Sequence, residues 1–343
     1  MRDIHSSTGG IQLSIAKGWK PNRYLSNMAM AFFQEPGFYV APDIFPVCPV
    51  PNSTGQYYIF NKAELAKDQV GRKPAFGKVE PAVFSHDEAT YKVEVDQIIV
   101  GVDDIASLNY QRAGAPATID PRRAKARLIT EQQKMHLDNL FADAFFKTGV
   151  WTNEKTGKAA SPGTNEFLFF SDANADIIGL FDDYKRDILL AGRRLPNRLT
   201  LGYDAFVAAK NHPQFLERVT GSGSTPNPAL VNENVIASVL GIETVKVLYS
   251  TRNAANLGQS ANMEFTFNSK DALLSYAPAN PSVEEPSAGY IFTWDMLGNG
   301  AWIATDAFEG EPGTHSEFVE GLMATQMKKT CDDLAIYLHG CVA

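Results

Sequence analysis

A long amphipathic helix is the pattern that most constrains the fold of this chain. Asp120 is a favourable N-cap and Pro121 suits the first helical position. The side chains of one helix face then recur at steps of three and four residues: Ala126, Ile129, Gln133, Leu137, Leu140, Phe141, Ala144 and Phe145. Gly149 is expected to end the helix, which would be about 40 Å long between residues 120 and 147. Such a length is unusual for an ordinary domain and indicates a structural spine.

A protruding hairpin is predicted before this helix. Its first strand is the aromatic and β-branched run at residues 57–60. Its second strand is indicated by Tyr91, Val93 and Val95, which alternate with polar residues. The stretch between them is polar and carries five basic residues: Lys62, Lys67, Arg72, Lys73 and Lys78. A hairpin with so long a tip is marginally stable alone and needs support from a neighbour.

The first part of the chain, residues 1–49, combines many apolar side chains with many prolines. The apolar residues between 20 and 46 are too numerous for a solvated tail, and they are Tyr24, Leu25, Met28, Met30, Phe32, Phe33, Phe38, Tyr39, Ile44 and Phe45. The prolines exclude long regular elements. We therefore expect an extended arm whose apolar side chains are buried against the spine helix or against a neighbouring subunit.

The remainder of the chain interleaves helices and strands. A helix is predicted from Ile177 to Gly192, another through Phe206 and Ala209, and a third at residues 233–240. Strands are predicted at residues 199–201, 245–249, 263–267, 302–305, 316–330 and 334–338. The last three could return to pack against the long helix. Residues 221–228 read as a flexible loop, and the order of elements indicates an α/β or α+β domain.

Bulk composition excludes several classes of protein. The 343 residues suggest about two domains. The net charge of −8 and the dispersed basic residues argue against strong binding of nucleic acid. There is no apolar run long enough for a membrane span, and the N-terminal residues do not resemble a signal peptide. Cys48, Cys331 and Cys341 lack metal-ligand spacing, so reduced thiols are expected, with synthesis in a cytoplasm.

Fragments of known binding motifs are present but incomplete. The segment 221–224 is rich in Gly and Ser but lacks the Gly-Lys-Ser/Thr ending of a phosphate loop. Asp172, Asn174 and Asp176 resemble the start of a calcium loop, with Asp183 at its twelfth position. However, Ile177 occupies the position where that loop needs Gly. Capping of the helix that begins at Ile177 is the favoured interpretation.

Histidines and acidic pairs do not form a recognisable active site. The six histidines are scattered along the chain: His5, His86, His136, His212, His315 and His339. His212 precedes Pro213 at a helix end, where capping is favoured over catalysis. The acidic pairs 103–104, 182–183 and 332–333 read as solvated residues, because adjacent side chains do not converge. The sequence therefore predicts no catalytic, cofactor-binding or metal-binding residues, and no enzyme.

Three segments carry a resemblance to a known family. Residues 193–219 read RRLPNRLTLGYDAFVAAKNHPQFLERV, residues 233–250 read ENVIASVLGIETVKVLYS, and residues 271–294 read DALLSYAPANPSVEEPSAGYIFTW. Together they resemble the central domain of major capsid proteins of tailed bacteriophages, whose fold is shared by encapsulins and herpesvirus capsid floors. The order of the other elements is similar to the same plan over nearly the whole chain.

The resemblance implies an α+β fold with a definite division of the chain. The expected parts are an N-terminal arm at 1–49, an extended loop at 50–100, a peripheral domain at 101–175 with 299–343, and an axial domain at 176–298. It also implies a separate scaffolding protein, because the arm is too close to the extended loop to leave room for a fused scaffolding segment. Some relatives join subunits through a Lys–Asn isopeptide bond, but no cross-linking residues are assigned here.

The function implied is that of a structural virion protein. Copies of the chain would form hexamers and pentamers of an icosahedral shell around double-stranded DNA, which they would contact only non-specifically. A portal and a decoration protein are further expected partners, with assembly in the host cytoplasm and final location in the virion. The alternatives are the shell of an encapsulin-like compartment and, more remotely, an α/β enzyme with an unrecognised site.

Overall fold

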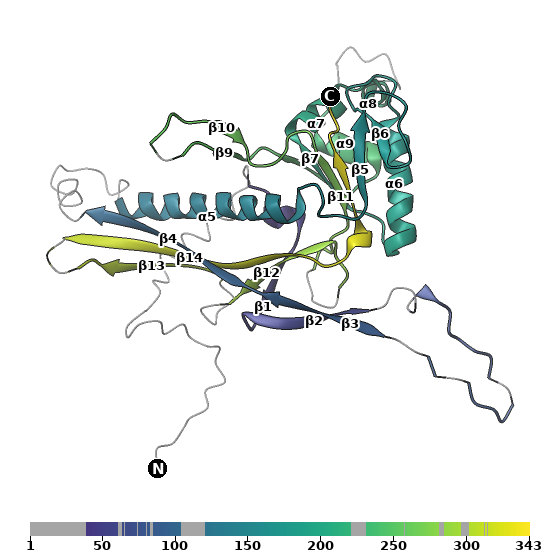
Figure 1. Ribbon diagram of the computed structural model, residues 1–343, viewed down its shortest axis with the longest axis horizontal. Coiled ribbons are helices and arrows are strands. Elements are labelled where there is room, and N and C mark those ends of the chain that lie inside the picture. Colours follow the sequence, from purple (N-terminus) through teal and green to yellow (C-terminus); the bar gives the residue numbers. More distant parts are fainter. Residues whose placement is uncertain are drawn as a thin grey trace.

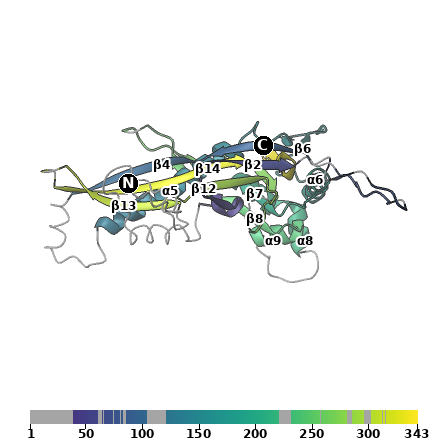
Figure 2. The same cartoon turned by 90° about the horizontal axis from the view of Figure 1, so that it is seen from below.

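The protein is α+β and consists of an elongated layer, a rounded body and a projecting hairpin (Figure 1). The computed structural model describes residues 39–60, 64, 66–73, 75–79, 81–82, 85–103, 121–220, 231–256, 258–280, 285–295, 302–311, 313 and 315–343. Seen from below, the elongated layer is thin, and the helices of the rounded body extend from one side of it (Figure 2).

The elongated layer is a sheet built around one long strand, β14. This strand pairs along one edge with β4, and along the other edge first with β13 and then with β12. A short strand, β1, extends the sheet by pairing parallel to β12. The bounds are β1 (Val47–Val50), β4 (Glu94–Asp103), β12 (Gly289–Trp294), β13 (Ile303–Glu309) and β14 (Ser316–Lys329).

Helix α5 (Pro121–Phe145) lies along this sheet and confirms the predicted spine. Ile129, Leu137 and Phe141 of the predicted face are buried. Close approach of helix and sheet requires glycine at position 321, because a Cβ there would lie 2.3 Å from Ile129 Cγ2. The helix ends at Phe145, before Gly149. The predicted N-cap Asp120 lies outside the described residues.

The rounded body is a second sheet covered by helices. Its strand order is β6-β5-β15-β11-β7-β8, with parallel and antiparallel pairs mixed. The strands are β5 (Glu154–Lys158), β6 (Glu166–Leu168), β7 (Arg198–Gly202), β8 (Thr244–Leu248), β11 (Ala272–Ser275) and β15 (Ala335–His339). The helices are α6 (Ile177–Gly192), α7 (Tyr203–Asn211), α8 (Pro213–Thr220) and α9 (Glu233–Leu240). The central strand β11 is buried along its whole length, as expected for a strand covered on both faces.

Two hairpins leave these layers. The first joins β2 (Thr54–Phe60) to β3 (His86–Lys92), and its first strand is the one predicted from the aromatic run. The second strand was predicted from Tyr91, Val93 and Val95, but β3 ends at Lys92 and Val95 lies in β4, which pairs with β14. The second joins β9 (Thr251–Asn253) to β10 (Met263–Phe265) and projects over helix α5 in Figure 1. Strand β10 was predicted at 263–267, whereas β9 is too short to give a sequence pattern.

The end of the predicted arm belongs to the subunit's own core. Residues 41–44 form a short helix, α2 (Ala41–Ile44), and strand β1 follows it. Ile44 and Phe45 are fully buried, and the Phe45 ring lies 4.7 Å from that of Phe145 in α5. This part of the apolar segment is thus buried on the spine helix. The apolar residues of the arm before Tyr39 lie outside the described residues, as does the predicted loop 221–228.

Most predicted helices and strands are confirmed, with ends that differ by up to four residues, as in β13, predicted at 302–305 and observed at Ile303–Glu309. The segment predicted as strand 334–338 begins with a 3₁₀ turn, η1 (Asp332–Leu334), before β15. Helices α2 and α8 and strands β1, β5, β6, β9, β11 and β12 were not predicted. In the described part of the chain, no helix combines the length and the apolar character needed to cross a membrane.

Candidate assembly surfaces

The projecting hairpin is fixed at its root. Tyr57 and Tyr91 are buried, and their rings lie 5.8 and 5.0 Å from the ring of Phe292 in β12. The Tyr91 and Phe292 rings are nearly parallel. Gly55 permits this packing, because a Cβ there would overlap the Tyr91 ring. The alternation of aromatic and polar residues that predicted the strand therefore also positions it on the sheet.

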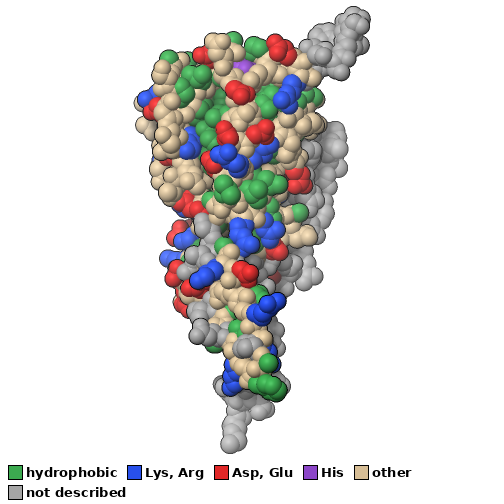
Figure 3. Space-filling view, turned by 90° about the vertical axis from the view of Figure 1, so that its right-hand side faces the viewer, with side chains coloured by type: hydrophobic (Ala, Val, Ile, Leu, Met, Phe, Trp, Pro, Cys, Tyr) green, Lys and Arg blue, Asp and Glu red, His purple; other side chains and the backbone are tan. Residues whose placement is uncertain are grey.

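The tip of the same hairpin carries apolar side chains that the described part of the subunit leaves exposed. Val70 is 90 % exposed and Phe76 is fully exposed at 109 %. Basic residues surround them, and Lys67, Arg72, Lys73 and Lys78 are also exposed. Figure 3 shows hydrophobic side chains with Lys and Arg beside them at the lower end of this face. Phenylalanine and arginine are enriched at protein interfaces, so exposed Phe76 and Arg72 on a projecting element favour a contact surface.

The lysines of this tip could be identified from the sequence, whereas the exposed apolar residues beside them could not. Val70, Phe76 and Val79 are isolated in a polar stretch, so they form no periodic pattern. They could have been recognised from their position, because the segment that contains them has no predicted set of buried side chains against which they could pack. Lys62, another predicted tip residue, lies outside the described residues.

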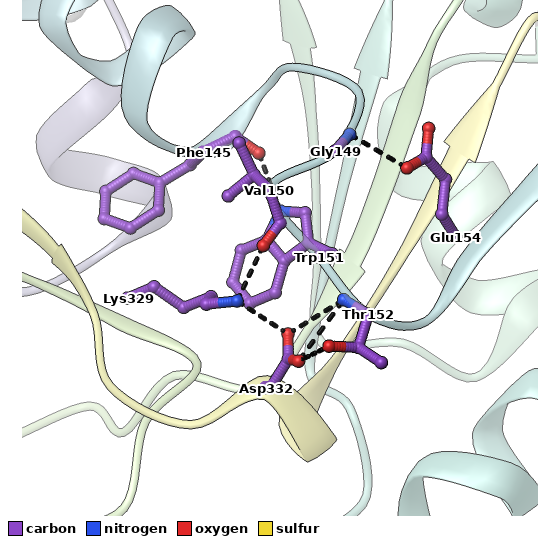
Figure 4. A network of polar contacts seen from close by, with 8 residues as sticks. All are labelled: Phe145, Gly149, Val150, Trp151, Thr152, Glu154, Lys329 and Asp332. Carbon is purple, nitrogen blue, oxygen red and sulfur yellow. Dashed lines mark hydrogen bonds and ion pairs between the residues drawn. The ribbon is translucent and has the colours of Figure 1, made fainter.

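A compact polar network joins the elongated layer to the rounded body (Figure 4). Lys329 Nζ, at the end of β14, donates to Val150 O at 2.6 Å and lies 3.1 Å from Asp332 Oδ1. Asp332 also accepts from the backbone N–H of Thr152 at 3.1 Å and from its hydroxyl. Trp151 Nε1 donates to Phe145 O at 2.7 Å. The end of the spine helix is thereby fastened to the turn between β14 and β15.

Electrostatic interactions stabilise the contacts of Lys329 and Asp332 with the turn after α5. Partial burial disfavours the charged form of Asp332, but hydrogen bonds from Thr152 and the charge of Lys329 outweigh it, so the Asp332 pKa is lowered. Lys329 Nζ also lies 5.7 Å from the Trp151 ring centroid, within the range of a cation–π contact. The two layers are therefore expected to move as one unit.

The fragments that resembled a calcium loop have structural roles, as the capping interpretation predicted. Asp176 is the N-cap of α6 and its Oδ1 accepts from Gly179 N at 3.0 Å. This bond and one from Gln214 lower the Asp176 pKa. Asp172 Oδ1 accepts from Asn174 N at 2.9 Å, while Asp183 lies exposed beside Arg186 on α6. These carboxylates do not converge on one point.

The histidines and acidic pairs are also dispersed. His212 is the C-cap residue of α7, and its Nδ1 accepts from Gln214 N at 3.3 Å, which confirms the capping interpretation. His136 lies 3.2 Å from Asp96 and His339 lies 3.0 Å from Asp271, two contacts that the sequence did not indicate. Asp182 pairs with Lys185. No group of three or more His, Cys, Asp or Glu suited to a metal ion occurs among the described residues.

The projecting hairpin, the sheet with its spine helix and the rounded body also occur in solved structures. No protein-family model and no curated protein matches the sequence. A crystal structure of a phage-related protein from Bordetella bronchiseptica matches with a TM-score of 0.68 at 16 % identity, over 94 % of this chain and 97 % of that chain. The fold is that of tailed-phage capsid proteins.

Two further structures are similar to the chain at 10 % identity. A structure from Microbacterium phage Oxtober96 has a TM-score of 0.52 and covers 89 % of this chain and 92 % of that chain. A virus-like particle from Pyrococcus furiosus has a TM-score of 0.51, covering 93 % of this chain and 100 % of that chain. The capsid-type fold thus extends over nearly the whole chain, and the α+β fold class predicted from the sequence is confirmed.

Proposed function

We propose that this chain is a major capsid protein, a subunit that assembles with copies of itself into an icosahedral shell around double-stranded DNA. The observation that carries the proposal is the capsid-type fold with a projecting hairpin whose apolar tip is uncovered in the single subunit. A two-stranded element of this kind is not stable by itself and gains from contact with a neighbour. Many modest contacts of this type suffice in a shell of many copies.

The proposed organisation follows the family plan. The proposed arm comprises residues 1–49, the extended loop 50–100, the peripheral domain 101–175 with 299–343, and the axial domain 176–298. The two domains share strands, because β5, β6 and β15 of the peripheral ranges lie in the sheet of the rounded body and β12 of the axial range lies in the elongated sheet. The pairing of β4 with β14 and of β1 with β12 connects these parts within one subunit. Proposed partners are further copies in hexamers and pentamers, a separate scaffolding protein, a portal and a decoration protein. Assembly would take place in the host cytoplasm, and the protein would have no enzymatic activity.

The experiment is expression with the scaffolding partner, followed by sedimentation and negative-stain electron microscopy. Closed particles tens of nanometres across are expected. A protein that remains monomeric to tetrameric under all such conditions would overturn the proposal. The variant Phe76→Ser should reduce the yield of closed particles, because it removes an exposed apolar contact without touching the core. Its free subunit should have the same thermal midpoint as the wild type.

An encapsulin-like compartment is the second candidate, since a virus-like particle has the same fold. It would also form closed shells, so particle formation alone does not separate the two. The contents do. Nucleic acid protected from nuclease in native particles supports the phage shell, whereas a packaged enzyme supports the compartment.

A further inference from the structure

A buried carboxyl group lies where three parts of the subunit meet. Asp138 belongs to the buried face of α5 and has no exposed surface. Its Oδ1 accepts a hydrogen bond from the backbone N–H of Ala41 at 3.2 Å, so it binds the first residue of helix α2. Its Oδ2 has no hydrogen-bond partner among the described residues. The third part of the junction is the base of the β9–β10 hairpin, where Ser250 precedes β9 and Thr266 follows β10. The hydroxyls of these two residues are also buried and lie 3.1 Å from each other.

The cations near this junction are engaged with other groups. Lys246 Nζ lies 2.9 Å from Asp43 Oδ2. Arg198 donates to the carbonyl groups of Asp43 and Ile44. Arg252 pairs with Glu264 at 2.9 Å and donates to Asn139 Oδ1. No described cation forms an ion pair with Asp138.

The other titratable groups around the junction do not neutralise Asp138 either. Tyr39 and Asp43 lie on the segment that Asp138 holds, and the Tyr39 pKa is raised by burial first and then by the charges of Glu131 and Asp138. His136 is on the same helix but contacts Asp96 of β4 at 3.2 Å. The ionised form of Asp138 is therefore a buried charge that no described cation balances, which is disfavoured.

Burial raises the pKa of Asp138 to about 7. The N–H groups of Ala41 and Val40 and the hydroxyl of Ser250 act in the opposite direction, while the charge of Asp43 adds to the rise. The carboxyl is thus neutral in mildly acidic solution and ionises near neutrality. Protonation removes the buried charge, whereas ionisation leaves a charge that hydrogen bonds offset only in part and that no described cation balances.

We infer that Asp138 is a pH-sensitive latch that fastens residues 39–45 to the spine helix. When Asp138 is protonated, the segment stays closed on α5. When Asp138 is ionised, opening of the segment hydrates the carboxylate and becomes easier. The latch controls the point at which the N-terminal part of the chain enters the subunit core, independently of whether the subunit forms a shell.

The test is hydrogen exchange of the peptide covering residues 39–46 in the unassembled full-length subunit, measured at pH 5.5 and pH 8.5. Rates are divided by the intrinsic exchange rates at each pH. With a pKa of about 7 when closed and about 3.9 when open, opening should become roughly thirtyfold more favourable between the two conditions. Peptides from the buried strand β11 should show no such change.

Two variants isolate the latch. Asp138→Asn keeps the shape and the acceptor for Ala41 N–H but removes the titration, so the pH response of the peptide should disappear. Asp43→Asn removes a neighbouring carboxylate and keeps Asp138, so the response should persist. A wild-type peptide whose protection is the same at both pH values overturns the inference, and so does an undiminished response in Asp138→Asn. Should Asp138→Asn fail to fold, the wild-type profile decides, because its midpoint must lie near pH 7.

Discussion

Replacing Phe45 with alanine should destabilise the subunit by about 3–5 kcal/mol, the usual cost of removing a buried phenylalanine side chain. Phe45 has no exposed surface. Its ring packs edge-on against Phe145 at 4.7 Å and lies 5.7 Å from Phe141, so the cavity would open beneath the spine helix. For a chain of 343 residues this cost corresponds to a fall in Tm of roughly 4–7 °C.

The measurement is urea unfolding of the free subunit followed by tryptophan fluorescence, with calorimetry for Tm. Phe76→Ala is the matched control, because it removes the same side chain from a fully exposed position. It should change the free energy of unfolding by less than about 0.5 kcal/mol. If Phe45→Ala were as stable as the control, residues 39–45 would not be part of the subunit core. Phe45 would then not stabilise the subunit by packing against α5.

Four further outcomes are expected. Trypsin should cut free subunits first at the hairpin tip and cut assembled shells there more slowly, and equal rates would contradict docking of the tip. The exposed sites are Lys67, Arg72 and Lys78, because Lys73 is followed by a proline that blocks cleavage. Boiled and reduced shells should run as one band near 37.6 kDa, whereas a ladder would reveal an isopeptide cross-link. Deletion of residues 1–38, which leaves α2 intact, should preserve the circular dichroism spectrum but prevent normal shells, and normal shells by electron microscopy would refute a role of the arm in assembly. Because the folded-state pKa of Asp138 is raised from about 4 to about 7, its contribution to stability should be greatest below pH 4 and fall by roughly 4 kcal/mol as the pH rises to 7. Comparison of urea unfolding of wild type and Asp138→Asn across this range checks the sign.

The assembly surface was only partly predictable from the sequence. The aromatic run at residues 57–60 predicted the first strand of the hairpin, whereas the alternation of Tyr91, Val93 and Val95 spans the end of β3 and the start of β4. The same reasoning could not show that Phe76 is uncovered, since exposure depends on the length of the hairpin beyond its last contact with the sheet. Asp138 was missed for a related reason. It follows Leu137 in the sequence but was not among the residues of the predicted buried face, and a helical pattern does not reveal which backbone N–H meets a carboxylate.

The sequence by itself determined the local elements. The spacing of Ile129, Leu137 and Phe141 determined the spine helix and its buried face, and Asp176 determined the start of α6. Only the tertiary structure decided which distant segments meet. Strand β1 pairs with β12, more than two hundred residues away, and Gly321 brings β14 against the helix. Periodicity and capping arise from neighbours along the chain, whereas strand pairing depends on backbone groups that are alike at every residue, so the partner of β1 follows only from how the whole core packs.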